Sequence, residues 1–173
     1  MIIKMRMSKE MLRYIELGAN TSQGGFIRNK IVAYSEKVIE EFRNKYNNTD
    51  VFTSAYTYDS EDIRNAKQAA HLYFDLDGKF AQADLSKIIE FLIKQNCPKE
   101  SIRIYYSGNK GFHIEIPFSA LNIQSTKKLN HIFEYIAKQI NTSLHTPSLD
   151  TRIYDNVRLW RLPNSINAKS GLY

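Results

Sequence analysis

The stretch that decides the fold is residues 71–78, HLYFDLDG, in which Asp75 and Asp77 follow an apolar run. The run predicts a strand, and residues two apart lie on the same face of a strand, so we expect the two Cα atoms ~6.5–7 Å apart on one face. Two such carboxylates repel each other unless a cation lies between them, and Mg²⁺ or Mn²⁺ prefers oxygen ligands. The alternative is one aspartate in a salt bridge and the other capping the turn at Gly78.

The segments after this strand predict alternating strands and helices in the order β-α-β-β-α-β. This order is typical of ferredoxin-like and RNA-recognition-motif-like folds, in which both helices cover one face of an antiparallel sheet and leave the other open. We therefore expect an α+β fold with an RNA-recognition-motif-like (split β-α-β) core. Its expected parts are the strand at 72–76, a helix capped by Asp84 and ended by Pro98, strands at 102–106 and 112–116, a helix capped by Ser125, and a final strand or strands within 150–162.

Alternation along the three core strands predicts which side chains share a face. The side chains expected under the helices are those of Leu72, Phe74, Leu76, Ile102, Ile104, Tyr106, Phe112, Ile114 and Ile116. The side chains expected on the open face are those of Tyr73, Asp75, Asp77, Arg103, Tyr105, Ser107, His113 and Glu115.

The first 70 residues predict a small helix-strand unit that packs on this core. Apolar residues recur with a helical period over 26–46, and we expect a second short helix before that one. Residues 51–58 are β-branched and aromatic, which favours a strand. The expected organisation is one domain, with an N-terminal α/β part at 1–70 and the core at 71–173.

Composition restricts the class of protein. Lys and Arg number 24 against 18 Asp and Glu, and the net charge of +6 favours polyanionic partners. Because Cys97 is the one cysteine, an internal disulfide is excluded, and we expect a reducing compartment, the cytoplasm or the nucleoid. No run of about 18 apolar residues is present, so we expect no membrane span.

A second motif lies in the hairpin that joins two of the core strands, YYSGNKGFHIEIP at 105–117. Gly108 and Gly111 allow a tight turn and a close approach to a ligand, and Lys110 adds positive charge. Ser107 and His113 can face the same anion from adjoining strand ends. This combination suits a triphosphate.

A third motif, SLDTRIYDNVRLWRLPNSINAKSGLY at 148–173, supplies a third carboxylate, Asp150, with Asp155 as a competing ligand. Its cationic side chains can contact phosphates. These are Arg152, Arg158, Arg161 and Lys169.

The three motifs together resemble the archaeo-eukaryotic primase superfamily, the primase-polymerases. Its signatures are an hhhDhD strand, an SGxxGxH hairpin and a later hydrophobic-Asp followed by RLxRLPxSxxxKxG. In this chain LYFDLD, SGNKGFH, the pair Leu149-Asp150 and RLWRLPNSINAKSG match them in order across residues 72–171.

The resemblance implies site residues. It implies that Asp75, Asp77 and Asp150 bind catalytic Mg²⁺ or Mn²⁺. The residues that it implies for nucleotide binding are Ser107, Gly108, Lys110, Gly111, His113, Arg161, Asn167 and Lys169. Cellular primases of this type often have histidine where Asn167 stands, which favours plasmid, phage or mobile-element relatives over a replicative subunit.

The implied function is a DNA primase or polymerase that joins nucleoside triphosphates on a single-stranded DNA or RNA template by two-metal catalysis. We expect a longer protein, with a helicase or primer-initiation domain beyond Tyr173. The residues considered for template binding are Arg28, Lys30, Lys37, Tyr56, Tyr58, Arg64 and Lys67.

Two other functions are considered. An RNA-recognition-like module would bind single strands without catalysis, through aromatic side chains on its open face. FDLDG also resembles the first motif of haloacid-dehalogenase-type phosphatases, in which Asp75 would be the nucleophile. Against this second reading, Lys79 stands where those enzymes have Thr or Val, and no later GDxxxD cluster follows.

Overall fold

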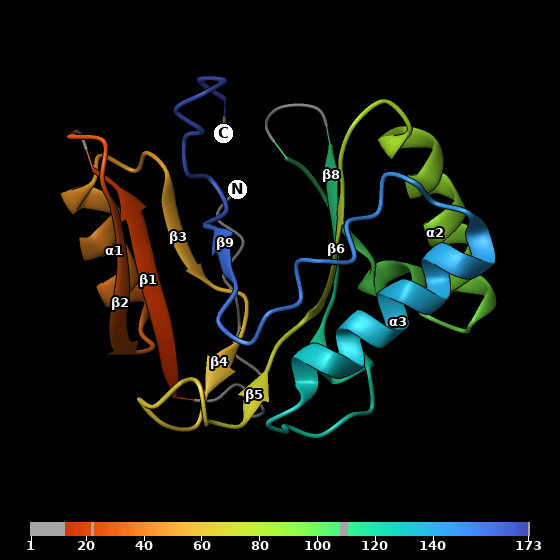
Figure 1. The fold of residues 1–173 in the computed structure, drawn as a ribbon, viewed down its shortest axis with the longest axis horizontal. Helices are drawn as coiled ribbons and strands as arrows, with labels where there is room; N and C mark the ends of the chain where they lie inside the picture. Colours follow the sequence, from red (N-terminus) through yellow and green to blue (C-terminus); the bar gives the residue numbers. More distant parts are fainter. Residues whose placement is uncertain (1–12, 22, 108–110, 173) are drawn as a thin grey trace.

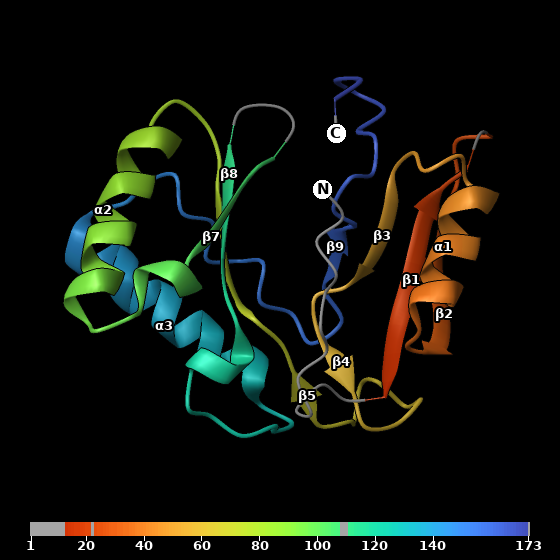
Figure 2. The same ribbon diagram turned by 180° about the vertical axis from the view of Figure 1, so that it is seen from behind.

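Two antiparallel sheets lie side by side in the computed structural model, which describes residues 13–21, 23–107 and 111–172 (Figure 1). Helix α1 (Glu36–Lys45) packs on the first sheet. Helices α2 (Ala81–Lys94) and α3 (Leu129–Leu144) cover the face of the second sheet that points away from the first, as both views show (Figures 1 and 2). The α+β class is confirmed.

The second sheet contains the three strands that the sequence predicted for the core. They are β6 (Leu72–Leu76), β7 (Arg103–Tyr106) and β8 (Phe112–Ile116), in the order β6-β8-β7. Every residue of β6 pairs with a residue of β8, including Asp75 with His113. Two short 3₁₀ helices, Lys99–Ser101 and Phe118–Ala120, flank this hairpin.

Both predicted helix caps in this part are wrong. Helix α2 begins at Ala81, so Asp84 lies inside its first turn, and α3 begins at Leu129 rather than beside Ser125. The carboxylate of Asp84 accepts hydrogen bonds from the distant Ser148 instead of from its own helix end. A tertiary contact has therefore replaced the local one.

The first sheet is larger than the helix-strand unit that we expected. Its path runs β5-β4-β1-β3-β9, with β2 paired to the other edge of β1. Its strands are β1 (Tyr14–Asn20), β2 (Phe26–Ala33), β3 (Val51–Ser54), β4 (Thr57–Tyr58), β5 (Gln68–Ala69) and β9 (Leu159–Arg161).

The predicted helix over residues 26–46 is wrong in its first half. Phe26–Ala33 form strand β2, which pairs with β1, and the helix begins only after Ser35, whose hydroxyl accepts a hydrogen bond from the N–H of Val38. Within the described residues the short helix expected before it is absent, since Tyr14–Asn20 are strand β1. Pairing with a neighbouring strand has overridden a helical period.

The final strand is also misplaced in the sequence prediction. Strand β9 pairs with β3 of the first sheet, with Phe52 opposite Arg161, and does not join the core strands. The second sheet is extended beside β6 by one isolated antiparallel bridge, between Leu76 and Leu149. The C-terminal part of the expected single domain therefore supplies a strand to the sheet of the N-terminal part.

The strand register confirms the predicted faces on all three core strands, because Ile104 lies opposite Ile114, which lies opposite Phe74, and opposite residues share a face. The predicted burial is wrong at β7. Phe74, Leu76 and Ile114 are fully buried, whereas Ile104 and Tyr106 are 46% and 53% exposed because β7 is the outer strand. Tyr73, expected on the open face, is buried. Among the described residues, no helix combines the length and the apolar character needed to cross a bilayer.

The two sheets meet at Trp160. The centroid of its ring lies 4.9 Å from that of Tyr73 and 4.4 Å from that of His113. Trp160 on β9 thus covers part of the face that we expected to be open.

We predict that Trp160→Ala will lower the free energy of unfolding by ~3 kcal/mol, because it removes the aromatic contact between the sheets. Tyr135→Ala, at a Tyr on α3 that is 64% exposed, is the matched control and should cost less than ~0.5 kcal/mol. Urea unfolding of the two variants measures the difference. Equal losses would show that Trp160 does not join the sheets.

Candidate functional site

The backbone brings the three predicted acidic residues together at the end of β6. Residues 148–150 run antiparallel beside this end, where the Asp77 N–H donates to the Ser148 carbonyl and the Asp150 N–H to the Asp75 carbonyl, both at 2.9 Å. Asp150 is therefore a direct neighbour of Asp75, although it is far away in the sequence.

The three carboxylates do not point at one position. Asp77 Oδ1 accepts from the N–H of Gly78 at 2.8 Å, which is the turn cap considered as an alternative. Asp150 accepts from the backbone and the guanidinium of Arg152, with Nε at 3.0 Å. Within the residues that the structure describes, no three His, Cys, Asp or Glu side chains are arranged to hold a metal ion. The donor atoms suit a hard divalent cation, but Asp150 would have to release Arg152.

Asp75 is the carboxyl group whose titration the site changes most. Burial raises the pKa of Asp75 to about 6, with the negative charge of Asp77 next and that of Asp150 smaller, while Arg158 opposes them. By contrast, the hydrogen bond from Arg152 holds the pKa of Asp150 below its usual value. A buried carboxylate that resists ionisation is one that a cation would stabilise.

His113 faces Asp75 across the β6–β8 ladder, with Nε2 3.5 Å from Oδ1. Burial, helped by the charge of Arg161, lowers the pKa of His113 to about 4, and Asp77 opposes this shift. Since the pKa of Asp75 is about 6, there is no pH at which both groups are mainly charged. At neutral pH His113 is a neutral imidazole that can donate one N–H.

The glycine hairpin lies directly against the end of β6. Ser107 Oγ accepts from the Gly111 N–H, and the Ser107 N–H donates to the Gly111 carbonyl, both at 3.0 Å. A Cβ at Gly111 would lie 2.1 Å from the carbonyl oxygen of Leu76, so no other residue fits without movement. Gly108 and Lys110 lie outside the described residues.

One of the remaining predicted nucleotide contacts, Arg161, is tied to Asp50. Arg161 forms an ion pair with Asp50 and lies over the ring of Phe52, with 4.9 Å to its centroid. Asn167 accepts from the backbone N–H of Lys169 at 3.0 Å, and the Lys169 side chain is exposed. Within the described residues the guanidinium of Arg161 is paired with Asp50 and not with Asp75, Asp77 or Asp150. Its link to those three residues is indirect, because its positive charge lowers the pKa of His113, which faces Asp75.

Arg158 is one of the four cationic side chains that the third motif offered for phosphates, but the resemblance did not assign it to the nucleotide. Its charge lowers the pKa of both Asp75 and Asp150, and its Nη1 lies 4.0 Å from Asp155. Its Nε is buried and has no hydrogen-bond partner among the described residues. The first arginine of RLWRLP was the available signal, but only the fold shows that it faces the carboxylates.

Two of the residues considered for template binding are excluded by burial. Tyr56 and Tyr58 are fully buried, and the hydroxyl of Tyr56 lies 2.9 Å from that of Tyr73. Tyr58 donates to the Asn156 carbonyl at 3.0 Å. Neither ring is available to stack on a base.

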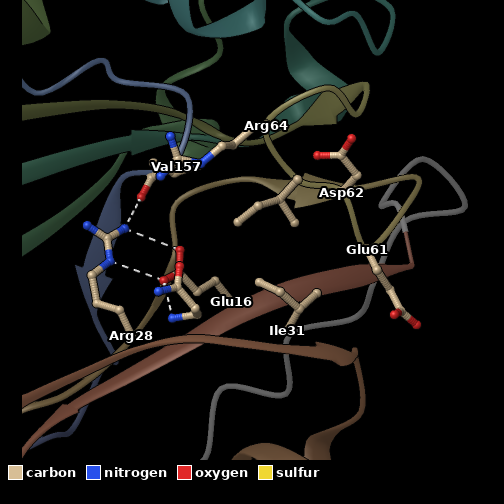
Figure 3. Close-up of a pocket in the computed structure, with 9 residues that line it drawn as sticks. Glu16, Arg28, Ile31, Glu61, Asp62, Arg64 and Val157 are labelled. Carbon is tan, nitrogen blue, oxygen red and sulfur yellow. Dashed lines mark hydrogen bonds and ion pairs between the residues drawn. The ribbon is translucent and has the colours of Figure 1, made fainter.

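A third candidate for template binding, Arg28, lines a cavity of about 300 Å³ (Figure 3). Its guanidinium pairs with the buried Glu16, with Nε 3.1 Å from Oε1, and donates to the Val157 carbonyl at 2.6 Å. Arg64, also considered for template binding, lines the same cavity, whereas none of the predicted catalytic or nucleotide-binding residues that the structure describes does. We interpret the contact between Arg28 and Glu16 as a structural ion pair at the edge of this cavity.

Comparison with protein-family models and with curated proteins finds no match for this chain. The resemblance to the primase-polymerases therefore stays a prediction that depends on the three motifs.

We predict that Gly111→Ala will cost ~2 kcal/mol of unfolding free energy, because its Cβ would collide with the backbone at Leu76. Gly78→Ala is the control: nothing lies within 4 Å of a Cβ there, so its cost of about 1 kcal/mol comes from a φ of +91°. Thermal unfolding of both variants compares the two causes. If Gly78→Ala is the more harmful, the hairpin does not pack as described.

We predict that Asp75→Asn will stabilise the metal-free protein above about pH 6. The pKa of Asp75 is raised from 3.8 to about 6, so the folded state binds this proton more tightly and stability falls as pH rises through that window. The variant should gain ~2 kcal/mol at about pH 7.5 and much less at about pH 4. Urea unfolding at both values tests this, with the exposed Asp62→Asn as a control for the loss of one negative charge.

Proposed function

We propose that the chain is the catalytic domain of a template-dependent nucleotidyltransferase, a primase-polymerase. The observation that carries the proposal is the pairing of residues 148–150 with the end of β6, because it brings Asp150 beside Asp75 and Asp77. The three acidic residues come from the first and third motifs, and the hairpin of the second motif lies against the same strand end.

We further propose that the second sheet is a split β-α-β, RNA-recognition-motif-like core. Its order β6-β8-β7 places the first and second strands on either side of the third. The bridge between Leu76 and Leu149 then stands where such a fold has its fourth strand, antiparallel to the first. In this interpretation the last strand is reduced to one residue pair, and the chain continues into the other sheet.

Asp75, Asp77 and Asp150 would hold Mg²⁺ or Mn²⁺. When bound, such ions activate an attacking 3′-hydroxyl and neutralise a leaving pyrophosphate. The raised pKa of Asp75 supports this assignment. It arises because Asp75 is buried next to another carboxylate, and a bound cation would offset both effects.

The other side chains would bind and orient the triphosphate. His113 would donate an N–H to a phosphate oxygen, and a neutral imidazole does this without repelling Arg161. Arg158, whose charge lowers the pKa of Asp75 and Asp150, is a second cation near the acidic residues. Arg161 and Lys169 belong to the stretch that the resemblance assigns to the nucleotide, with Arg161 held in place by Asp50.

A single-stranded template is the proposed polyanionic partner of this basic chain. With Tyr56 and Tyr58 buried, Phe26 on β2 is the aromatic residue of the first sheet that is open to a base, with 47% of its surface exposed. Its ring packs edge-on against Phe52, 5.5 Å between centroids, and Arg161 lies over Phe52. Such a surface suits stacking and phosphate contacts.

A non-catalytic module that binds single strands is the second candidate. The contact that favours it is the hydrogen bonding of Asp150 to Arg152, which occupies one of the three proposed ligands. The antiparallel pairing of β6 with β8 argues against the phosphatase alternative, because the phosphatases that the motif resembles have it in a parallel sheet.

The decisive experiment measures incorporation of labelled nucleotides on a homopolymer template, with and without primer, in Mg²⁺ or Mn²⁺. We expect Asp75→Ala/Asp77→Ala to lose more than ~100-fold of the rate, beyond what loss of an outer-shell partner costs. It should still bind single strands, and the exposed Asp62→Ala should keep full activity. If wild type and double variant bind single strands equally and neither extends or starts a chain, the binding module is the function.

A further inference from the structure

A buried carboxylate on α2 contacts the segment that carries Asp150. Asp84 is 1% exposed, and its Oδ2 accepts from the Ser148 N–H at 3.0 Å and from the Ser148 hydroxyl at 2.7 Å. Its Oδ1 accepts from Lys87 Nζ at 3.0 Å. All the donors come to one side chain, which ties a helix to a loop that is distant in sequence.

The hydrogen bonds to Ser148 continue into the acidic site. The carbonyl of Ser148 accepts from the Asp77 N–H, and two residues further on the Asp150 N–H donates to Asp75. Ser148 is thus held from one side by Asp84 and from the other by the end of β6.

The charge of Asp84 is retained in the folded chain. Burial by itself would raise the pKa of Asp84, but the hydrogen bonds from Ser148 and Lys87 hold it below the usual value. Lys87 also donates to the His145 carbonyl at 3.2 Å, which attaches the start of the same loop. Charged hydrogen bonds to a buried carboxylate are stronger than neutral ones, so this contact holds the loop firmly.

The site needs such an attachment. Asp75, Asp77 and Asp150 are like charges, and their mutual repulsion favours separation of the segment that carries Asp150. The backbone contacts that oppose this at the strand end are two hydrogen bonds, which together form the isolated bridge between Leu76 and Leu149.

We infer that Asp84 is a positioning residue, which clamps residues 148–150 so that Asp150 stands beside Asp75 and Asp77, where it would bind a divalent cation on releasing Arg152. The inference rests on the proposed function for the role of the cation. The clamp itself is defined by the contacts of Asp84 and Ser148.

The first test reads the clamp without any cation. In Asp84→Leu we expect amide hydrogen exchange to become at least ~10-fold faster at Asp77 and Asp150, while Ile114 in the middle of β8 keeps its protection. Glu16→Leu is the matched control, since Glu16 is also a buried carboxylate, 1% exposed, with an ion-pair partner. It should leave the Asp77 and Asp150 amides protected.

The second test reads the cation. Binding of Mn²⁺ alone, followed by electron paramagnetic resonance, should need ~10-fold more Mn²⁺ for half-saturation in Asp84→Leu than in wild type, as outer-shell partners usually require. Glu16→Leu should match wild type. Asp84→Asn keeps an acceptor for Ser148 and should fall between wild type and Asp84→Leu.

Ser148→Ala is the second variant, for use if Asp84→Leu fails to fold. It removes the hydroxyl that donates to Asp84 and leaves the N–H of Ser148 in place. It should therefore shift hydrogen exchange and Mn²⁺ binding in the same direction as Asp84→Leu. Wild-type exchange and wild-type Mn²⁺ binding in a folded Asp84→Leu or in Ser148→Ala would overturn the clamp. If instead wild type and Asp75→Ala/Asp77→Ala bind Mn²⁺ equally, the proposed function fails, and the exchange measurement alone decides the clamp.

Discussion

The structure depends on holding like charges together at one strand end. Asp75, Asp77 and Asp150 lie where β6 finishes, and the hydrogen bonds between residues 75–77 and 148–150 oppose their repulsion. The cost appears in the titration of Asp75, whose pKa rises to about 6 through burial and its acidic neighbours. Cations close by reduce this cost: Arg152 hydrogen-bonds to Asp150, and Arg158 acts on both Asp75 and Asp150.

Elements from several parts of the chain pack against this strand end in the residues that the structure describes. Gly111 brings the hairpin backbone onto the Leu76 carbonyl, and Trp160 packs on His113 from the other sheet. Behind the strand, α2 supplies Asp84 to the loop that carries Asp150. Side chains that must act together are thus fixed by elements from the whole chain, which is what a site with demanding geometry requires.

The alternation of apolar and polar residues was enough to predict two of the core strands. The strands at 72–76 and 112–116 were predicted at their observed bounds. That Asp150 lies beside the aspartate pair was implied by the resemblance to a family and not by local pattern. Features set by partners distant in sequence were missed. Residues 26–33 form a strand because β1 pairs with them. The side chain of Asp84 accepts from Ser148 instead of capping its helix. The ion pairs of Asp150 and Arg161 also depend on folding and not on spacing.

Strand β9 has a consequence for the chain as a whole. It comes from the last quarter of the sequence but completes the sheet that begins at Tyr14, so its ladder with β3 closes the fold over the core between them. A cut of the chain after β5 would leave an N-terminal piece without β9 and a C-terminal piece without β3, the strand with which β9 pairs. We expect two such pieces to fold together when mixed rather than each alone. Recombination between genes would therefore have to exchange the whole stretch from β1 to β9.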